Sequence, residues 1–180
     1  MKVIAINGSA HADGNTHQAL EIVVKELKDN GIETEIIDLV KMNINPFTFG
    51  DDPKLNDDMI MLKDKVMKAQ GLILGSPTYY SNVSSRMQMF IERLGALTSG
   101  DDLKGKVGAS VAVARRQGAN FVYAAMNYFF GIKQMVIATS SYWNNIVAKE
   151  PGKIKEDKEG IETLKKLGKN MAELLIKLNK

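Results

Sequence analysis

Short apolar runs and longer amphipathic stretches alternate along this chain of 180 residues. The runs are rich in β-branched and aliphatic residues with few polar interruptions, which is typical of strands buried on both faces of a sheet. The amphipathic stretches repeat apolar residues every three or four positions, as helices with one buried face do. The pattern predicts strands over residues 2–7, 33–39, 71–75, 106–114 and 133–139, and helices over 16–30, 57–69, 83–97, 119–130 and 157–179.

Strands that alternate with helices in this way predict an α/β fold with a parallel sheet, because parallel neighbours need helical crossovers. Five strands fit the flavodoxin-like doubly wound sheet of order 2-1-3-4-5, with helices on both faces. The ligand site of that order lies beyond the carboxyl ends of the strands, between strands 1 and 3. We therefore expect the loops 8–16, 76–83 and 115–119 to converge on one site, and residues 1–180 to form a single domain.

The composition excludes several kinds of chemistry. The chain has no cysteine, so disulfides, thiolate zinc sites, cysteine-held iron–sulfur clusters and a cysteine nucleophile are excluded. The net charge of +3 is small and spread along the chain, which argues against a nucleic-acid partner. No apolar run is long enough for a membrane span, and the N-terminal run is too short for a signal peptide. We expect a cytoplasmic protein without a membrane partner.

The loop after the first predicted strand has the features of a phosphate site. It lies at the N-terminus of a helix, where unpaired backbone N–H groups and the helix dipole favour an anion. Hydroxyl, amide and imidazole side chains add donors, and glycine lets the backbone approach closely. The candidate phosphate-binding residues are Ser9, His11, Gly14, Asn15 and Thr16. The alternative that Asn15 and Thr16 only cap the helix stays open here, and His17 is expected to be a solvated side chain.

The loop after the third predicted strand presents two aromatic side chains, Tyr79 and Tyr80, at the same edge of the sheet. Tyrosine can lie against a flat ring while hydroxyl and backbone groups meet its polar edge. An ordinary turn that contains Pro77 and partly buried tyrosines is an equally good interpretation of this loop alone.

The two loops together resemble a known family. The motifs GSAHADGNT and GSPTYYSNVSSRMQMFIERL are similar to those of the NADPH-dependent FMN reductase group of the flavodoxin-like superfamily, and within it to the iron–sulfur flavoproteins. The resemblance implies that FMN is the cofactor and that the first loop holds its phosphate. It also implies further flavin contacts, with the ribityl chain and ring bordered by Pro77, Thr78, Tyr79, Tyr80 and Asn82, and the pyrimidine edge by Ala114, Arg115 and Gly118.

The chain departs from the iron–sulfur flavoproteins in the long connection over residues 40–56. That subgroup places a compact cysteine cluster there, whereas this chain has no cysteine. We therefore expect no iron–sulfur cluster and no metal site. We expect the connection to cover flavin or a neighbouring subunit through Phe47 and Phe49 instead.

The resemblance implies an FMN-dependent NAD(P)H oxidoreductase of the flavin or quinone reductase type. Reduced nicotinamide, as NADPH or NADH, would pass electrons through bound FMN to a small acceptor such as a quinone or a free flavin. No acid–base pair is needed, because the cofactor carries the chemistry, and Arg115 is a candidate for stabilising charge on the ring. The alternative is a flavodoxin-like FMN electron carrier between protein partners. Relatives imply a homodimer or homotetramer.

Overall fold

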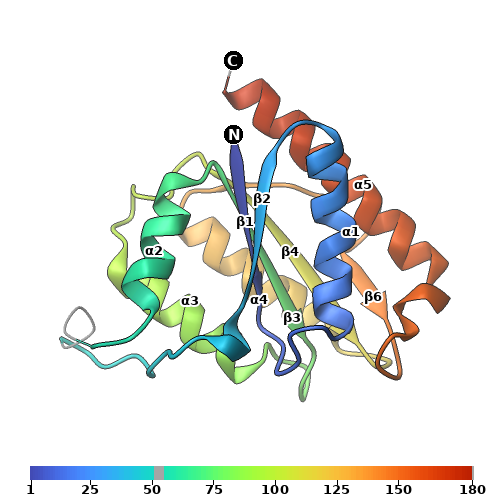
Figure 1. Cartoon of the computed structure of the whole chain (residues 1–180), viewed down its shortest axis with the longest axis horizontal. Coiled ribbons are helices and arrows are strands. Elements are labelled where there is room, and N and C mark those ends of the chain that lie inside the picture. Colours follow the sequence, from blue (N-terminus) through green and yellow to red (C-terminus); the bar gives the residue numbers. More distant parts are fainter. Residues whose placement is uncertain (51–54, 180) are drawn as a thin grey trace.

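The computed structural model describes residues 1–50 and 55–179, and the sheet at its centre has the predicted topology. Its strands are all parallel and run in the order β2-β1-β3-β4-β5, with a sixth short strand beside β4 (Figure 1). The strand bounds are β1 (Lys2–Asn7), β2 (Glu33–Asp38), β3 (Gly71–Pro77), β4 (Val107–Ala114), β5 (Val136–Ile137) and β6 (Asn145–Val147). The predicted flavodoxin-like order is therefore confirmed.

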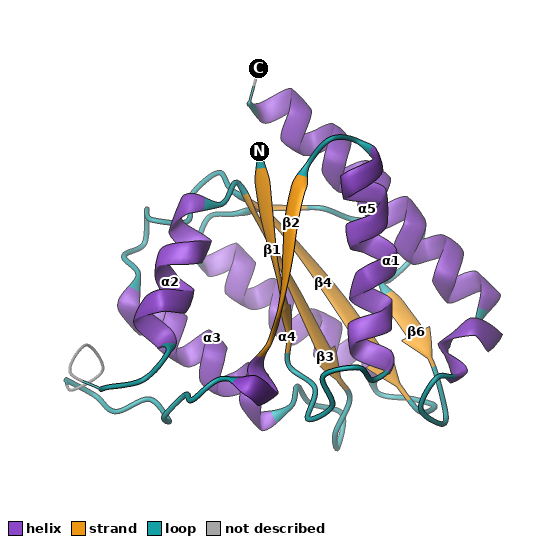
Figure 2. Cartoon of the chain, viewed as in Figure 1, coloured by secondary structure: helices purple, strands orange, loops and turns teal. Residues whose placement is uncertain are grey.

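Two layers of helices cover the sheet (Figure 2). One layer holds α1 (Asn15–Asp29) and α5 (Lys158–Leu178), and the other holds α2 (Met59–Lys68), α3 (Ser85–Leu97) and α4 (Ala119–Ile132). Successive strand residues face opposite layers: Ile4 packs with α2 and α3, and Ala5 packs with α1 and α5. This double burial explains why the strands read as continuous apolar runs. No described helix is both long and apolar enough to cross a membrane.

The fifth strand is split, so the prediction of one strand over 133–139 was wrong. β5 pairs with the beginning of β4 through Val107 and Gly108, and β6 pairs with its end through Ala112, Val113 and Ala114. The predicted strand cannot begin at residue 133, because Lys133 caps α4 and Gln134 has a φ of 56°. The chain leaves the sheet after Ala138 and returns at Asn145, so β6 brings the segment that follows it to the carboxyl edge of the sheet.

A buried ion pair anchors the long connection between β2 and α2. Arg93 on α3 donates to both carboxylate oxygens of Asp57, and both side chains are fully buried. Arg93 also donates to the carbonyl oxygen of Asn45 at 2.9 Å, and the backbone N–H of Asn45 donates to Asp57 at 2.9 Å. Burial by itself would raise the pKa of Asp57, but Arg93 and the backbone donors outweigh it and lower that pKa to about 2. Asp57 therefore remains a carboxylate and fixes this connection to α3.

Candidate active site

A cavity of about 490 Å³ lies beyond the carboxyl ends of the strands, where the three predicted loops meet. Its wall includes residues from the loops after β1, β3 and β4, and also the segment after β6. In Figure 1 these loops lie together at the lower edge of the sheet. β1 is flanked by β2 and β3, so the cavity is at the point where the strand order reverses, which is where ligands bind in this architecture.

The N-terminus of α1 opens into this cavity. Among the described residues, no side chain caps the helix, which starts after Gly14, and its first turn holds no acidic residue. The first N–H groups of a helix have no partner within the helix, and Asn15 and Thr16 in this turn line the cavity. The end of α1 is therefore suited to an anion.

The loop between β1 and α1 is held in place from both sides. The Gly8 N–H donates to the Gly75 carbonyl at 2.8 Å, and the Ser84 hydroxyl donates to the Gly8 carbonyl at 2.6 Å. A Cβ on Gly8 would lie 2.8 Å from the Cβ of Met87, so only glycine lets the loop lie this close to α3. Further along, Ser9 accepts a hydrogen bond from the His11 N–H at 3.0 Å. These contacts hold the loop against β3 and the start of α3.

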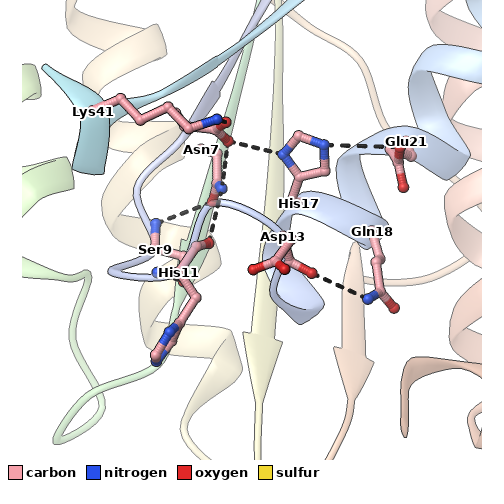
Figure 3. Close-up of polar contacts among 9 residues, drawn as sticks. Asn7, Ser9, His11, Asp13, His17, Gln18, Glu21 and Lys41 are labelled. Carbon is pink, nitrogen blue, oxygen red and sulfur yellow. Dashed lines mark hydrogen bonds and ion pairs between the residues drawn. The ribbon is translucent and has the colours of Figure 1, made fainter. Parts of the chain in front are cut away.

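A polar network lies behind the loop (Figure 3). The Asn7 amide donates to Asp38 at 2.9 Å, and its oxygen accepts from the Ser9 N–H at 3.0 Å. His17 Nδ1 lies 2.8 Å from the same carboxylate, and Lys41 donates to it at 2.9 Å. Burial raises the pKa of Asp38, but the hydrogen bonds from Asn7, Lys41 and His17 outweigh it and the pKa is lowered. The prediction that His17 is a solvated side chain was wrong, because it is part of this network.

The Asn15 side chain has hydrogen-bond partners within the chain. Its amide nitrogen donates to the carbonyl of Glu150 at 2.8 Å, and its oxygen accepts from the N–H of Gly152 at 2.9 Å. The Asn15 side chain thus joins the start of α1 to the segment after β6. Both polar atoms of the side chain are used in this way, so the backbone N–H of Asn15, in the first turn of α1, is the group of this residue that can bind an anion.

The loop after β3 supplies an unpartnered hydroxyl. The Thr78 N–H donates to the Val113 carbonyl at 2.8 Å, which fixes this residue against β4. Its Oγ1 is buried and has no hydrogen-bond partner among the described residues, although Thr78 lines the cavity. A buried polar atom normally has a partner. A ligand with polar atoms would supply one here.

A tight turn follows, in which Tyr79 lines the cavity and Tyr80, Ser81 and Asn82 are not among its described lining residues. Tyr79 and Asn82 exchange two backbone hydrogen bonds of 3.0 and 2.9 Å, with Tyr80 and Ser81 at φ values of 51° and 59°. Gly118, at φ 89°, packs against this turn, and a Cβ there would lie 2.6 Å from the Ser81 hydroxyl. Gly118 therefore supports the turn, and Tyr80 is fully exposed.

The structure brings most of the predicted site residues to one cavity. Those that line it are Ser9, His11, Gly14, Asn15, Thr16, Pro77, Thr78, Tyr79, Ala114 and Arg115. Tyr80, Asn82 and Gly118 are not among its described lining residues. The prediction missed the segment 148–152, because nothing near it in the sequence marks it as part of a site. Its only sequence signal is the short apolar run 146–148, the first two residues of which belong to β6.

The connection over residues 40–56 does not reach the cavity within its described part. Phe49 is 92% exposed and Phe47 is 40% exposed, and neither lines the cavity. Within one chain, the predicted cover over a flavin is therefore not formed by these two side chains. The other alternative, contact with a neighbouring subunit, stays a prediction. Residues 51–54 of this connection lie outside the described part.

An uncapped helix N-terminus, an unpartnered hydroxyl and a tyrosine around one cavity fit a flat ligand that carries a phosphate. FMN has that shape and chemistry, so the residues present fit the group. On a parallel sheet of order 2-1-3-4-5, these features define a flavodoxin-like flavoprotein.

Comparison with known proteins gives the family. The sequence profile of the NADPH-dependent FMN reductases matches residues 1–148, and the chain belongs to this family. An iron–sulfur flavoprotein of Methanocaldococcus jannaschii is 36% identical over 189 residues, which cover 97% of each chain. An FMN-dependent NADPH-azoreductase of Staphylococcus aureus is 33% identical over 98 residues, which cover 52% of each chain. The structure of RosB has a TM-score of 0.83 at 16% identity, over 99% of this chain and 80% of that one, and it supports the fold.

Proposed function

We propose that this FMN-dependent oxidoreductase oxidises NADPH or NADH and passes the electrons to a small acceptor such as a quinone or a free flavin. The observation that carries the proposal is the cavity at the strand reversal, which is lined by the first turn of the uncapped helix α1 and by Thr78. Family membership supports the same reaction class. We propose a small-molecule acceptor because the cavity is open to solvent and, at about 490 Å³, has the size of a small-molecule site.

The chain's residues would bind and orient the cofactor. The first turn of α1, with Ser9 and Thr16, would hold the phosphate through N–H and hydroxyl donors. Thr78 Oγ1 would gain a hydrogen-bond partner, and Tyr79 would lie beside the ring. Arg115 would place positive charge near the ring edge. When bound, FMN supplies hydride acceptance and electron transfer, so the chain needs no acid–base pair of its own.

The open side of the cavity supports alternation of the two substrates. Tyr79 is 47% exposed and Arg115 is also exposed, so the wall that they form is accessible from solvent. A reduced nicotinamide and an acceptor that both approach this wall would occupy the same space. The proposed kinetic pattern is therefore ping-pong.

The test is steady-state oxidation of NADPH and NADH by the FMN-loaded protein, with a quinone or free FMN as acceptor. Parallel double-reciprocal lines are expected when one substrate is varied at several concentrations of the other. Intersecting lines would contradict a shared binding space. An absence of turnover with every acceptor would contradict the reductase function and leave the electron carrier.

A further inference from the structure

A second hollow, of about 460 Å³, lies beside the candidate active site, and its described wall consists of three cations. These are Arg115 and Arg116 from the loop after β4, and Lys149 from the segment after β6. Arg115 and Lys149 also line the active-site cavity. The hollow therefore adjoins that cavity, and Arg115 and Lys149 belong to the wall of both.

Strand pairing places the two segments side by side. Ala114 pairs with Val147, and the Ala148 N–H donates to the Ala114 carbonyl at 2.9 Å. Arg115 and Lys149 are the residues that directly follow Ala114 and Ala148. The backbone ladder between β4 and β6 thus sets two cations next to each other at the end of the sheet.

Contacts on both sides hold the segment that carries Lys149. The Asn15 side chain binds Glu150 and Gly152, as described above. Before Lys149, the Val147 N–H donates to the carboxylate of Asp157 at 2.7 Å. The backbone position of Lys149 is therefore fixed by contacts on both sides of it.

The three cations have no ion-pair partner within the described part of the chain. Several exposed lysines elsewhere do, for example Lys25 with Asp29 at 2.5 Å and Lys153 with Glu156 at 2.6 Å. Asp13 and Glu150 are acidic residues of the neighbouring cavity wall, but neither lines the hollow. Like charges brought together repel one another. An anion shared by the three would remove this repulsion.

We propose that this cationic hollow binds the phosphate groups of the nicotinamide dinucleotide. The inference rests on the proposed function, because it assigns the part of the co-substrate that lies away from the nicotinamide ring. The proposed site of the FMN phosphate is at the N-terminus of α1, so the hollow is available to a second phosphorylated molecule. Arginine forms paired hydrogen bonds with phosphate, and lysine adds a point charge. The pyrophosphate and the 2′-phosphate of NADPH share this chemistry.

The test compares two double variants that remove the same charge. The double variant Arg116→Ala with Lys149→Ala removes two of the three cations of the hollow and leaves Arg115 in the cavity wall. The control, Lys166→Ala with Lys177→Ala, removes two exposed lysines of α5 that have no ion pair among the described residues. Isothermal titration calorimetry then measures the dissociation constants of NADP⁺ and NAD⁺ on oxidised, FMN-loaded protein. No turnover is involved, so this readout is independent of the proposed reaction.

We expect the Arg116 and Lys149 variant to bind NADP⁺ at least about tenfold more weakly than the parent, since hydrogen bonds to charged groups are lost. The control should bind it as the parent does. A loss for both dinucleotides supports the pyrophosphate as the bound group, and a loss for NADP⁺ alone supports the 2′-phosphate. Unchanged binding of both, or a parent that binds neither, would overturn the inference. Failure of NADPH to reduce the flavin would instead contradict the proposed function.

Discussion

Two adjacent residues at the start of α1, Asn15 and Thr16, contribute to the site in different ways. Asn15 uses its side chain to hold the segment 148–152, whereas Thr16 is buried and lines the cavity at the proposed phosphate position. Replacement of Thr16 by Val should weaken FMN by roughly tenfold and leave riboflavin unchanged, because one hydrogen bond to a charged group is lost. Asn15→Ala should weaken both flavins and increase hydrogen exchange in the segment 148–152.

Fluorescence titration of the apoprotein with each flavin measures these affinities. An equal effect of both variants on FMN and riboflavin would contradict the separation of roles. The sequence alone predicts Asn15 and Thr16 as site residues, and both line the cavity, but it could not show that the partner of Asn15 is 135 residues away.

The buried ion pair of Asp57 and Arg93 predicts how the stability of the protein depends on pH. The pKa of Asp57 is lowered from 3.8 to about 2, so its contribution to stability is present above about pH 4 and is lost as the pH falls toward 2. Protonation of this group should lower the free energy of unfolding by about 2 kcal/mol over that range. Asp57→Asn should remove this part of the pH dependence and lower stability at neutral pH by about 3 kcal/mol, since Arg93 stays buried.

Urea unfolding of parent and variant between pH 7 and pH 2 is the measurement. As a comparison, Asp64→Asn changes an exposed residue of α2 and should leave the curve close to that of the parent. An Asp57→Asn protein as stable as the parent at every pH would contradict this interpretation.

At the scale of elements, the sequence predicted the helices and strands that have a clear apolar pattern, and it missed the short strand that depends on pairing with a neighbour. The strand β1 and the helix α1 agree closely with the predicted ranges, because strongly patterned segments bury an apolar face wherever they lie. β6 has three residues and exists through its pairing with β4. A run so short carries no periodicity of its own. The segment 148–152 follows β6, so that part of the site could not be predicted either.

The connection between β2 and α2 carries a prediction about metal content. Iron–sulfur clusters in proteins are held by cysteine thiolates, and this chain has none. Protein purified without oxygen should therefore contain flavin but neither stoichiometric iron nor acid-labile sulfide. Iron and sulfide assays with a visible spectrum measure this, and a cluster at one equivalent per chain would contradict the prediction.

At the scale of the whole molecule, α4 presents an unusual surface. It contains no charged residue, and Phe121, Tyr128 and Ile132 are each more than two-thirds exposed. Apolar surface of this kind marks an interaction site when it is contiguous. We expect the chain to form a homodimer or homotetramer, and Tyr128→Lys with Ile132→Lys to reduce its mass in solution.

Analytical ultracentrifugation of parent and variant measures the assembly state. The control is Ile176→Lys, which adds a charge at an exposed isoleucine of α5 and should leave the mass unchanged. A parent that is monomeric at all concentrations would contradict the expectation.

The measurement that tests the central claim most directly is anaerobic stopped-flow mixing of the FMN-loaded protein with NADPH or NADH. The account predicts that at least one reduced nicotinamide bleaches the flavin absorbance in a single turnover, and that a quinone then restores it. Dithionite serves as the control that the bound flavin is reducible. If dithionite bleaches the flavin while neither nicotinamide does, the protein is not a nicotinamide-dependent reductase, and the electron-carrier function replaces it.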